Sequence, residues 1–98
     1  MWILETDDPA TGARVTFRIP FGSVKTIGRS TGAEFIVDAA LVSRLHCQLT
    51  ATIDALRVKD LDSTNGTFVN GSRVQTEELY DGDTLSVGRV DLTVTRSG

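Results

Sequence analysis

Apolar and polar residues alternate one by one over several short stretches, and this period of two is what most constrains the fold. Such alternation puts apolar side chains on one face of a β-strand and polar side chains on the other. It occurs at residues 15–19, 47–53, 56–59, 84–87 and 90–94, with shorter apolar stretches at residues 2–4, 24–27, 35–37 and 67–69. Turn-forming pairs such as Asn65-Gly66, Asn70-Gly71 and Asp81-Gly82 separate the stretches. About ten closely spaced short strands predict an antiparallel β-sandwich with functional loops at one end.

One stretch also fits a helix on local evidence. Residues 38–49 place Leu41, Leu45 and Leu49 four positions apart behind Asp38, a residue type that caps helix N-termini. Strand-like stretches lie on both sides of it. They favour a loop that leads into a strand, and the helix stays the alternative.

Length, charge and cysteine content narrow the class of protein. The 98 residues suit one domain, residues 1–98. The net charge is −3 and the ten basic residues are spread along the chain, which argues against direct nucleic-acid binding. The single cysteine, Cys47, excludes an intrachain disulfide and favours an intracellular setting, cytoplasmic or nuclear. No apolar run reaches the roughly 18 residues of a membrane span, and the first residues lack signal-peptide features, so we expect no membrane association.

Three short pieces carry groups suited to chemistry: IGRS at residues 27–30, SRLHCQL at 43–49 and STNGT at 63–67. Each borders a strand-like stretch, so each is expected at a strand end. Together they offer two guanidinium groups, several hydroxyls and an amide, but almost no carboxylate. Because these groups are mainly hydrogen-bond donors, they are suited to binding a compact anion such as a phosphate. Taken singly, each of these residues also has an ordinary structural explanation as a turn, cap or core residue.

The order of these pieces resembles the forkhead-associated (FHA) domain family. Gly28-Arg29 comes first, then Ser43-Arg44-Leu45-His46, then Ser63-Thr64-Asn65-Gly66-Thr67, within a similar region of residues 24–95. The resemblance implies an eleven-stranded β-sandwich that recognises phosphothreonine in partner proteins through loops at one end. It also implies that residues 38–46 form a loop rather than a helix, with a strand beginning near His46.

The resemblance assigns the binding residues position by position. Arg29 matches the arginine that grips the phosphate, where its planar fork of N–H donors can meet two oxygens. Ser43 matches a serine that donates its hydroxyl hydrogen to the phosphate. Arg44 and Thr64 match further phosphate-contact positions. Asn65 matches the asparagine that binds the peptide main chain.

Other matching positions support the site. Gly28 and Gly66 match glycines that let the backbone turn, and His46 matches a histidine that braces the binding loop. The departures are small: residues 39–40 are both alanine where relatives carry acidic or turn residues, and Leu45 replaces a common basic residue. The resemblance further implies a pocket for the peptide residue about three places after the phosphothreonine. Its candidate walls are the loops at residues 30–34 and 38–44, to which Arg73 or Arg89 could add.

The expected function is therefore that of a phosphothreonine-peptide reader that is not an enzyme, needs no cofactor or metal and acts as a monomer. Its expected partner is a phosphothreonine-containing protein, such as a kinase or kinase substrate. One alternative is a module of the same fold that binds without phosphate or binds its own chain. A hydrolase using Ser43, His46 and Asp60 or Asp62 is a remote alternative, because no nucleophile-elbow motif is present. A metal site at His46 and Cys47 is disfavoured, because adjacent strand residues face opposite sides.

Overall fold

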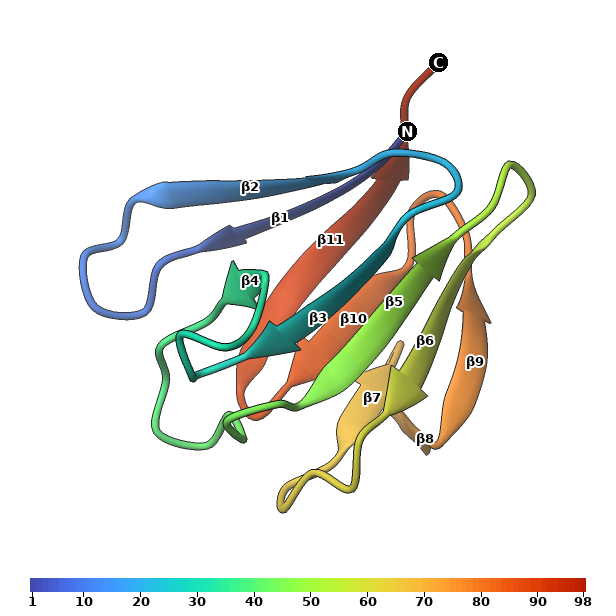
Figure 1. Cartoon of the computed structure of the whole chain (residues 1–98). Coiled ribbons are helices and arrows are strands. Elements are labelled where there is room, and N and C mark those ends of the chain that lie inside the picture. The colour runs from blue at the N-terminus through green and yellow to red at the C-terminus, as the bar shows by residue number, and fades with distance from the viewer.

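The computed structural model describes all 98 residues, and it consists of eleven strands in two sheets (Figure 1). The strands are β1 (Trp2–Asp7), β2 (Arg14–Ile19), β3 (Val24–Gly28), β4 (Phe35–Ile36), β5 (Cys47–Ala51), β6 (Leu56–Asp60), β7 (Thr67–Val69), β8 (Ser72–Val74), β9 (Thr76–Leu79), β10 (Thr84–Val87) and β11 (Val90–Arg96). The predicted all-β sandwich is confirmed. Residues 37–46 form a loop, so the helical alternative is wrong. No helix is present that could cross a membrane.

The two sheets have different strand orders. The six-stranded sheet runs β2-β1-β11-β10-β7-β8, and the five-stranded sheet runs β4-β3-β5-β6-β9. Neighbouring strands pair antiparallel, with the exception of β3 and β4, which pair in parallel through Ile27–Phe35 and Gly28–Ile36. The connection over residues 29–34 brings the chain back beside β3, and β4 then runs parallel to β3 and leads into the loop before β5.

The core lies between the sheets and follows the alternation in the sequence. Cys47, Leu49 and Ala51 of β5 are buried, whereas the residues between them are half-buried. Trp2 is also buried, and its indole Nε1–H donates to the Thr52 carbonyl oxygen at 2.7 Å. This bond satisfies the polar edge of the largest core side chain and links β1 of one sheet to the end of β5 in the other.

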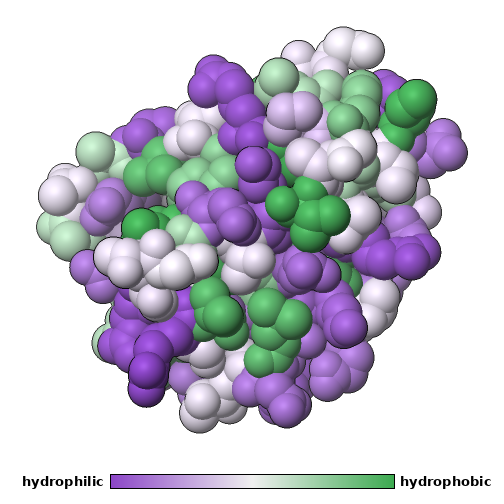
Figure 2. Space-filling model, in the orientation of Figure 1, coloured by the Kyte–Doolittle hydropathy of each residue, from purple (hydrophilic) through white to green (hydrophobic).

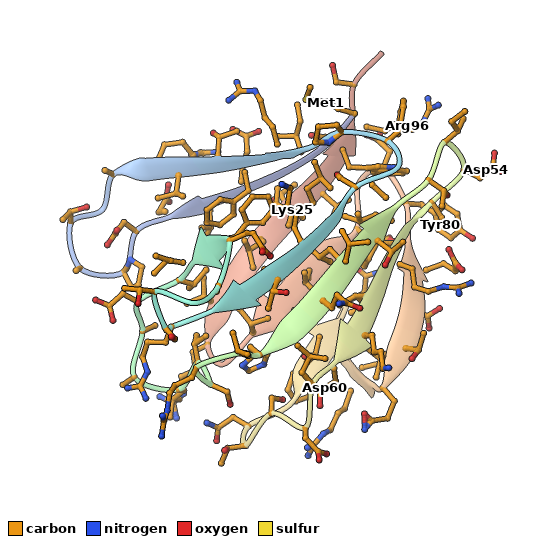
Figure 3. All side chains as sticks on the ribbon, viewed as in Figure 1. Met1, Lys25, Asp54, Asp60, Tyr80 and Arg96 are labelled. Atoms are coloured by element: carbon orange, nitrogen blue, oxygen red, sulfur yellow. The ribbon has the colours of Figure 1, made fainter.

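Four of the connections lie at the end of the sandwich opposite the chain termini (Figure 1). The β3–β4, β4–β5, β6–β7 and β10–β11 connections gather at one end, which we call the loop end. Figure 3 shows Asp60 at this end, with Met1 and Arg96 at the other. The terminal ammonium of Met1 donates to the Ser97 carbonyl oxygen at 2.6 Å, which holds the two termini together. On the face drawn in Figure 2, hydrophobic residues form small separate groups among polar ones.

Candidate functional site

Backbone hydrogen bonds bring the 28–30 and 43–46 segments together at the loop end. The Arg29 amide donates to the Ser43 carbonyl oxygen at 2.9 Å, and the Ser30 amide donates to the Arg44 carbonyl oxygen at 3.2 Å. These bonds continue the pairing of β3 with β5 beyond the ends of the strands. Arg29 and Ser43 are therefore held opposite each other by the backbone, although the chain separates them by a strand and a loop.

Gly28 allows this close approach because it has no side chain. A Cβ atom at this position would stand 1.9 Å from the Arg44 carbonyl oxygen and 2.7 Å from the Arg44 carbonyl carbon. The Gly28 carbonyl also accepts from the Val37 amide at 2.9 Å, so its backbone is held from two sides. The turn at Arg29 thus depends on steric space at Gly28 rather than on an unusual φ angle, since φ is not positive there.

His46 connects two loops of the loop end from inside the protein. Its side chain is fully buried, and its Nδ1 accepts from the Ser43 amide at 3.1 Å. Its Nε2 lies 2.8 Å from the Gly66 carbonyl oxygen. Because Nδ1 accepts, Nε2 carries the proton and donates to Gly66. Both ring nitrogens bond to backbone groups, so His46 is not placed to take a proton from the Ser43 hydroxyl, and the geometry argues against the hydrolase alternative.

Asp60 organises the β6–β7 loop at the end of β6. Its carboxylate accepts from the Ser63 amide at 3.1 Å, the Ser63 hydroxyl at 2.5 Å and the Thr67 hydroxyl at 2.7 Å. The Ser63 oxygen in turn accepts from the Gly66 amide at 3.0 Å. Burial alone would raise the pKa of Asp60, but the hydrogen bonds from Ser63 and Thr67 outweigh it, and the pKa lies below its ordinary value.

From the sequence alone, Asp60 was considered only as a residue of a hydrolase site, and its structural role was missed. The signal in the sequence was the aspartate itself, because aspartate side chains commonly accept hydrogen bonds from backbone amides a few residues further along the chain. Gly88 was missed as well. It has a φ of +59°, and a Cβ atom there would stand 2.9 Å from the Leu41 carbonyl oxygen. The β10–β11 turn therefore packs directly against the 37–46 loop.

Thr64 and Asn65 reach across to the 37–46 loop. The Thr64 amide donates to the Ser43 hydroxyl oxygen at 3.1 Å, which leaves the hydroxyl hydrogen of Ser43 free to donate elsewhere. The Asn65 side-chain Nδ2 donates to the Leu41 carbonyl oxygen at 3.0 Å. Since an amide has two N–H donors and one acceptor oxygen, one N–H and the Oδ1 of Asn65 remain available for a ligand.

These side chains surround a hollow of about 160 Å³, which we call the loop hollow. Its lining residues are Arg29, Ala40, Leu41, Val42, Ser43, Thr64 and Asn65. This volume is enough for a compact anion. No carboxylate lines it. The salt bridges of the protein belong to Arg14 and Arg57, so the guanidinium of Arg29 has no carboxylate partner of its own.

The structure thus brings four of the five predicted ligand-binding residues to one hollow and leaves one outside. Arg29, Ser43, Thr64 and Asn65 line the loop hollow. Arg44 does not line it; its side chain is exposed, and its carbonyl packs against Gly28. Of the expected walls, residues 40–43 contribute and residues 30–34 do not.

Two larger hollows lie elsewhere on the protein and suit an anion less well. One of about 270 Å³ beside β1 and β11 includes Glu5, Asp7 and Asp91 in its lining. Another of about 330 Å³ beside β5, β6 and β9 includes Asp54 and Glu78. Arg14 and Arg89 also line the first of these hollows and Arg57 lines the second, but the carboxylates in both linings repel a negative group. The smaller loop hollow is therefore the better candidate for anion binding.

The fold and the loop hollow together define a β-sandwich whose loops present hydrogen-bond donors around a space for an anion. The model of the FHA domain matches residues 25–88, and the chain belongs to the FHA domain family. The resemblance noted in the sequence is thereby confirmed at the level of the family.

Known relatives are similar over most of this chain. The ABC transporter ATP-binding/permease protein Rv1747 of Mycobacterium tuberculosis is 40% identical over 79 residues, which cover 81% of this chain and 9% of that protein. The FhaA FHA domain, solved in complex with the intracellular domain of Rv3910, is 34% identical with a TM-score of 0.84, covering 96% of this chain and 99% of that chain. A further FHA structure, from work on phosphothreonine-dependent FHA domain interactions, is 32% identical with a TM-score of 0.83, covering 99% and 97%. The chain spans only 18% of full-length FhaA of M. tuberculosis.

Proposed function

We propose that this chain is a phosphothreonine-dependent binding module for a partner protein. The observation that carries the proposal is the meeting of Arg29, Ser43, Thr64 and Asn65 around one hollow without a carboxylate. Membership of the FHA family supports it, as does the similarity to an FHA domain studied for phosphothreonine-dependent interactions. The chain acts by binding rather than by catalysis.

Each lining residue has a chemical role in this proposal. A phosphothreonine carries about −1.5 to −2 charges near neutral pH and three acceptor oxygens. The guanidinium of Arg29 meets two of these oxygens, and the free hydroxyl hydrogen of Ser43 meets another. Thr64 adds a hydroxyl donor at the rim, and Arg44 adds positive charge from outside the hollow. The free N–H and oxygen of Asn65 bind the peptide main chain beside the phosphothreonine.

Gly28, Gly66 and His46 support the site in this proposal. His46 fixes the distance between the backbone at Ser43 and the backbone at Gly66 through its two hydrogen bonds. The partner we expect is a phosphorylated kinase or kinase substrate, bound by one domain of residues 1–98 acting as a monomer. The intracellular setting remains a prediction.

The test is calorimetry with a threonine-phosphorylated peptide and its unphosphorylated twin. An extended peptide across the loops buries little area, so we expect micromolar affinity, about −8 kcal/mol, for the phosphorylated form only. The Arg29→Ala variant should lose about 2–5 kcal/mol, the range for breaking a hydrogen-bonded charge pair. Arg18→Ala is the matched control, since Arg18 is an exposed arginine on β2, away from the loop end.

Two results would contradict the proposal. Equal affinity for the two peptides would favour the alternative of phosphate-independent binding. Unchanged affinity in Arg29→Ala would remove this arginine from the phosphate site. Binding should also weaken below about pH 6, where the phosphate takes up its second proton.

A further inference from the structure

Strand β2 forms a free edge of the six-stranded sheet. It pairs with β1 on one side, from Trp2–Ile19 to Asp7–Arg14, and no strand lies on its other side (Figure 1). With six residues it is the longest of the four strands that end the two sheets, since β8 has three residues, β4 has two and β9 has four. An unpaired strand of this length presents backbone donors and acceptors with which another extended chain can pair.

The hydrogen-bond pattern identifies the backbone groups of β2 that point outward. In an antiparallel pair, residues alternate between bonding to the neighbouring strand and pointing away from it. The Asp8 amide donates to the Ala13 carbonyl oxygen at 2.7 Å in the register of the β1–β2 pair, so every second residue after Ala13 bonds to β1. The residues between them, Arg14, Thr16 and Arg18, therefore direct their N–H and C=O groups to the open side of β2.

The edge strand β9 is closed by one of its own side chains. The Asp60 amide donates to the Gln75 carbonyl oxygen at 2.7 Å, so by the same alternation the backbone of Glu78 points outward from the β6–β9 pair. Its amide donates to the carboxylate of the preceding residue, Glu77, at 3.0 Å. The outward amides of β2 have no such acceptor, so β2 is the long edge that is left open.

Apolar surface accompanies the open side of β2. Phe17 stacks on Phe35 of β4 with the ring centroids 4.5 Å apart, and both Val15 and Phe17 are only half-buried. Ile36 on β4 is 46% exposed. Val15, Phe17 and Ile36 share one small hollow between β2 and β4. A strand added beside β2 covers this hollow with the side chains that it turns toward the sandwich.

The charges of β2 decide between two kinds of occupant. Arg14 and Arg18 share the outer face with Thr16; Arg14 pairs with Glu5 and Asp7, whereas Arg18 has no salt bridge. If two copies of the chain paired through their outward groups, centred on Thr16, each Arg14 would stand opposite Arg18 of the other copy. Like charges directly opposite each other destabilise a sheet. The edge thus disfavours a second copy and favours a foreign strand with a carboxylate opposite Arg18.

We propose that the open side of β2 is an interaction surface that takes an extended acidic segment of a partner polypeptide as an additional strand of the six-stranded sheet. The outward backbone groups of Arg14, Thr16 and Arg18 bond to this segment, a mode of recognition in which main-chain bonds supply affinity. The segment places a carboxylate opposite Arg18 and apolar side chains over Ile36. The surface is separate from the loop hollow and needs no phosphate, so it does not depend on the proposed function.

The side-chain part of the experiment measures fluorescence anisotropy with a labelled peptide in which valine and aspartate alternate, and with a twin that has lysine in place of aspartate. The wild-type protein should bind the Asp peptide about three- to tenfold more tightly than the Lys peptide, and high salt should reduce this ratio. Arg18→Glu should reverse the preference. Arg73→Glu is the matched control and should leave the ratio unchanged, since Arg73 is an exposed arginine without a salt bridge on the three-residue edge strand β8.

The backbone part of the experiment uses Thr16→Pro. Proline removes one outward N–H and no bond to β1, and it is tolerated on edge strands where the N–H faces solvent. Affinity for the Asp peptide should fall about two- to tenfold, the size expected of one hydrogen bond. In NMR spectra of the wild type, the Asp peptide should shift the amides of Arg14, Thr16 and Arg18 and slow their hydrogen exchange. Arg18→Glu leaves the backbone intact, so it tests the surface even if Thr16→Pro does not fold.

Several results would overturn the proposal. These are equal affinity for the two peptides, no binding of the Asp peptide at millimolar concentration, a preference that Arg18→Glu leaves unchanged, and amide shifts confined to the loop hollow. A wild-type dimer in sedimentation velocity that Thr16→Pro dissociates would assign the edge to a second copy and would overturn it as well. Failure of phosphothreonine peptides to bind, by contrast, removes the proposed function and leaves this surface standing.

Discussion

Replacing His46 with alanine should weaken two loops of the site at once. The imidazole is fully buried and bonds to the Ser43 amide and the Gly66 carbonyl oxygen. Its removal leaves both backbone groups without a partner, and an unsatisfied buried group costs about 1–3 kcal/mol. Ser43 is only half-buried, so water can reach part of the gap. We therefore expect a loss of about 2–4 kcal/mol in the free energy of unfolding.

Urea denaturation and calorimetry measure this loss. For a domain of this size, each kcal/mol corresponds to about 4–8 °C in Tm, so Tm should fall by about 8–32 °C. Phosphopeptide affinity should fall as well, even at a temperature where the variant is folded, because Ser43 and Gly66 are no longer held together. Gln48→Ala is the control, since this half-buried side chain on β5 makes no hydrogen bond, and we expect it to change stability by less than about 0.5 kcal/mol.

A His46→Ala variant with the stability of Gln48→Ala would refute this reasoning. It would mean that the two loops are held in place without the histidine. A variant that loses stability but keeps full peptide affinity would refute only the link between the histidine and the binding geometry.

Three further predictions follow from the same contacts. Gly28→Ala should lower the free energy of unfolding, measured by urea denaturation, by at least about 2 kcal/mol and weaken peptide binding, because a Cβ atom would stand 1.9 Å from the Arg44 carbonyl oxygen. A variant as stable as the wild type would show that the backbone can shift to make room for the Cβ atom. Because the pKa of Asp60 is lowered, the stability that this carboxylate contributes is complete above about pH 4 and is lost as the pH falls further. The Asp60→Asn variant should therefore be less stable than the wild type at pH 7 and lose less stability on acidification. Parallel curves of stability against pH for the two proteins would contradict this prediction. Burial, together with the charge of Asp60, raises the pKa of the Cys47 thiol to about 12, although a hydrogen bond with Thr67 acts in the opposite direction. A thiol reagent at pH 8 should therefore modify Cys47 only in denaturant. Rapid modification of the native protein would be inconsistent with this burial.

The strands that alternate clearly could be predicted from the sequence, and the ones that do not alternate could not. β5 and β11 have long runs of period two and were located correctly. β8 and β9 are short and mostly exposed, so their residues carry no apolar pattern that a reading of the sequence could detect. Ile53 was counted with the β5 run, but it lies in the turn after Ala51 and is 63% exposed.

The turn after β5 explains the misassigned isoleucine. The Thr52 amide and hydroxyl both donate to the Ala55 carbonyl oxygen, each at 3.0 Å, which closes a tight turn over residues 52–55. Within such a turn, Ile53 has no sheet neighbour to bury it. A hydroxyl-stabilised turn competes with strand extension, and the hydrophobic pattern alone does not reveal which of the two is formed.

The order of three motifs was enough to select the candidate site residues, but it did not indicate all of the residues that support them. Gly28 approaches Arg44 and Gly88 approaches Leu41 across long distances in the sequence, so no local pattern indicates that a Cβ atom would collide there. Asp60 carries a local motif, yet its importance arises from the burial of its partner Thr67. The position of Arg44 outside the loop hollow depends on how the backbone pairs, which only the folded chain reveals.

The central claim is that the loop hollow binds phosphothreonine, and an amide-resolved NMR titration with a phosphothreonine peptide tests it most directly. We expect the largest chemical-shift changes on the amides of Arg29, Ser43, Thr64 and Asn65, and no change at these amides with the unphosphorylated peptide. Changes centred instead on the opposite end of the sandwich, near Phe21 and Ile53, or identical changes with both peptides, would contradict it.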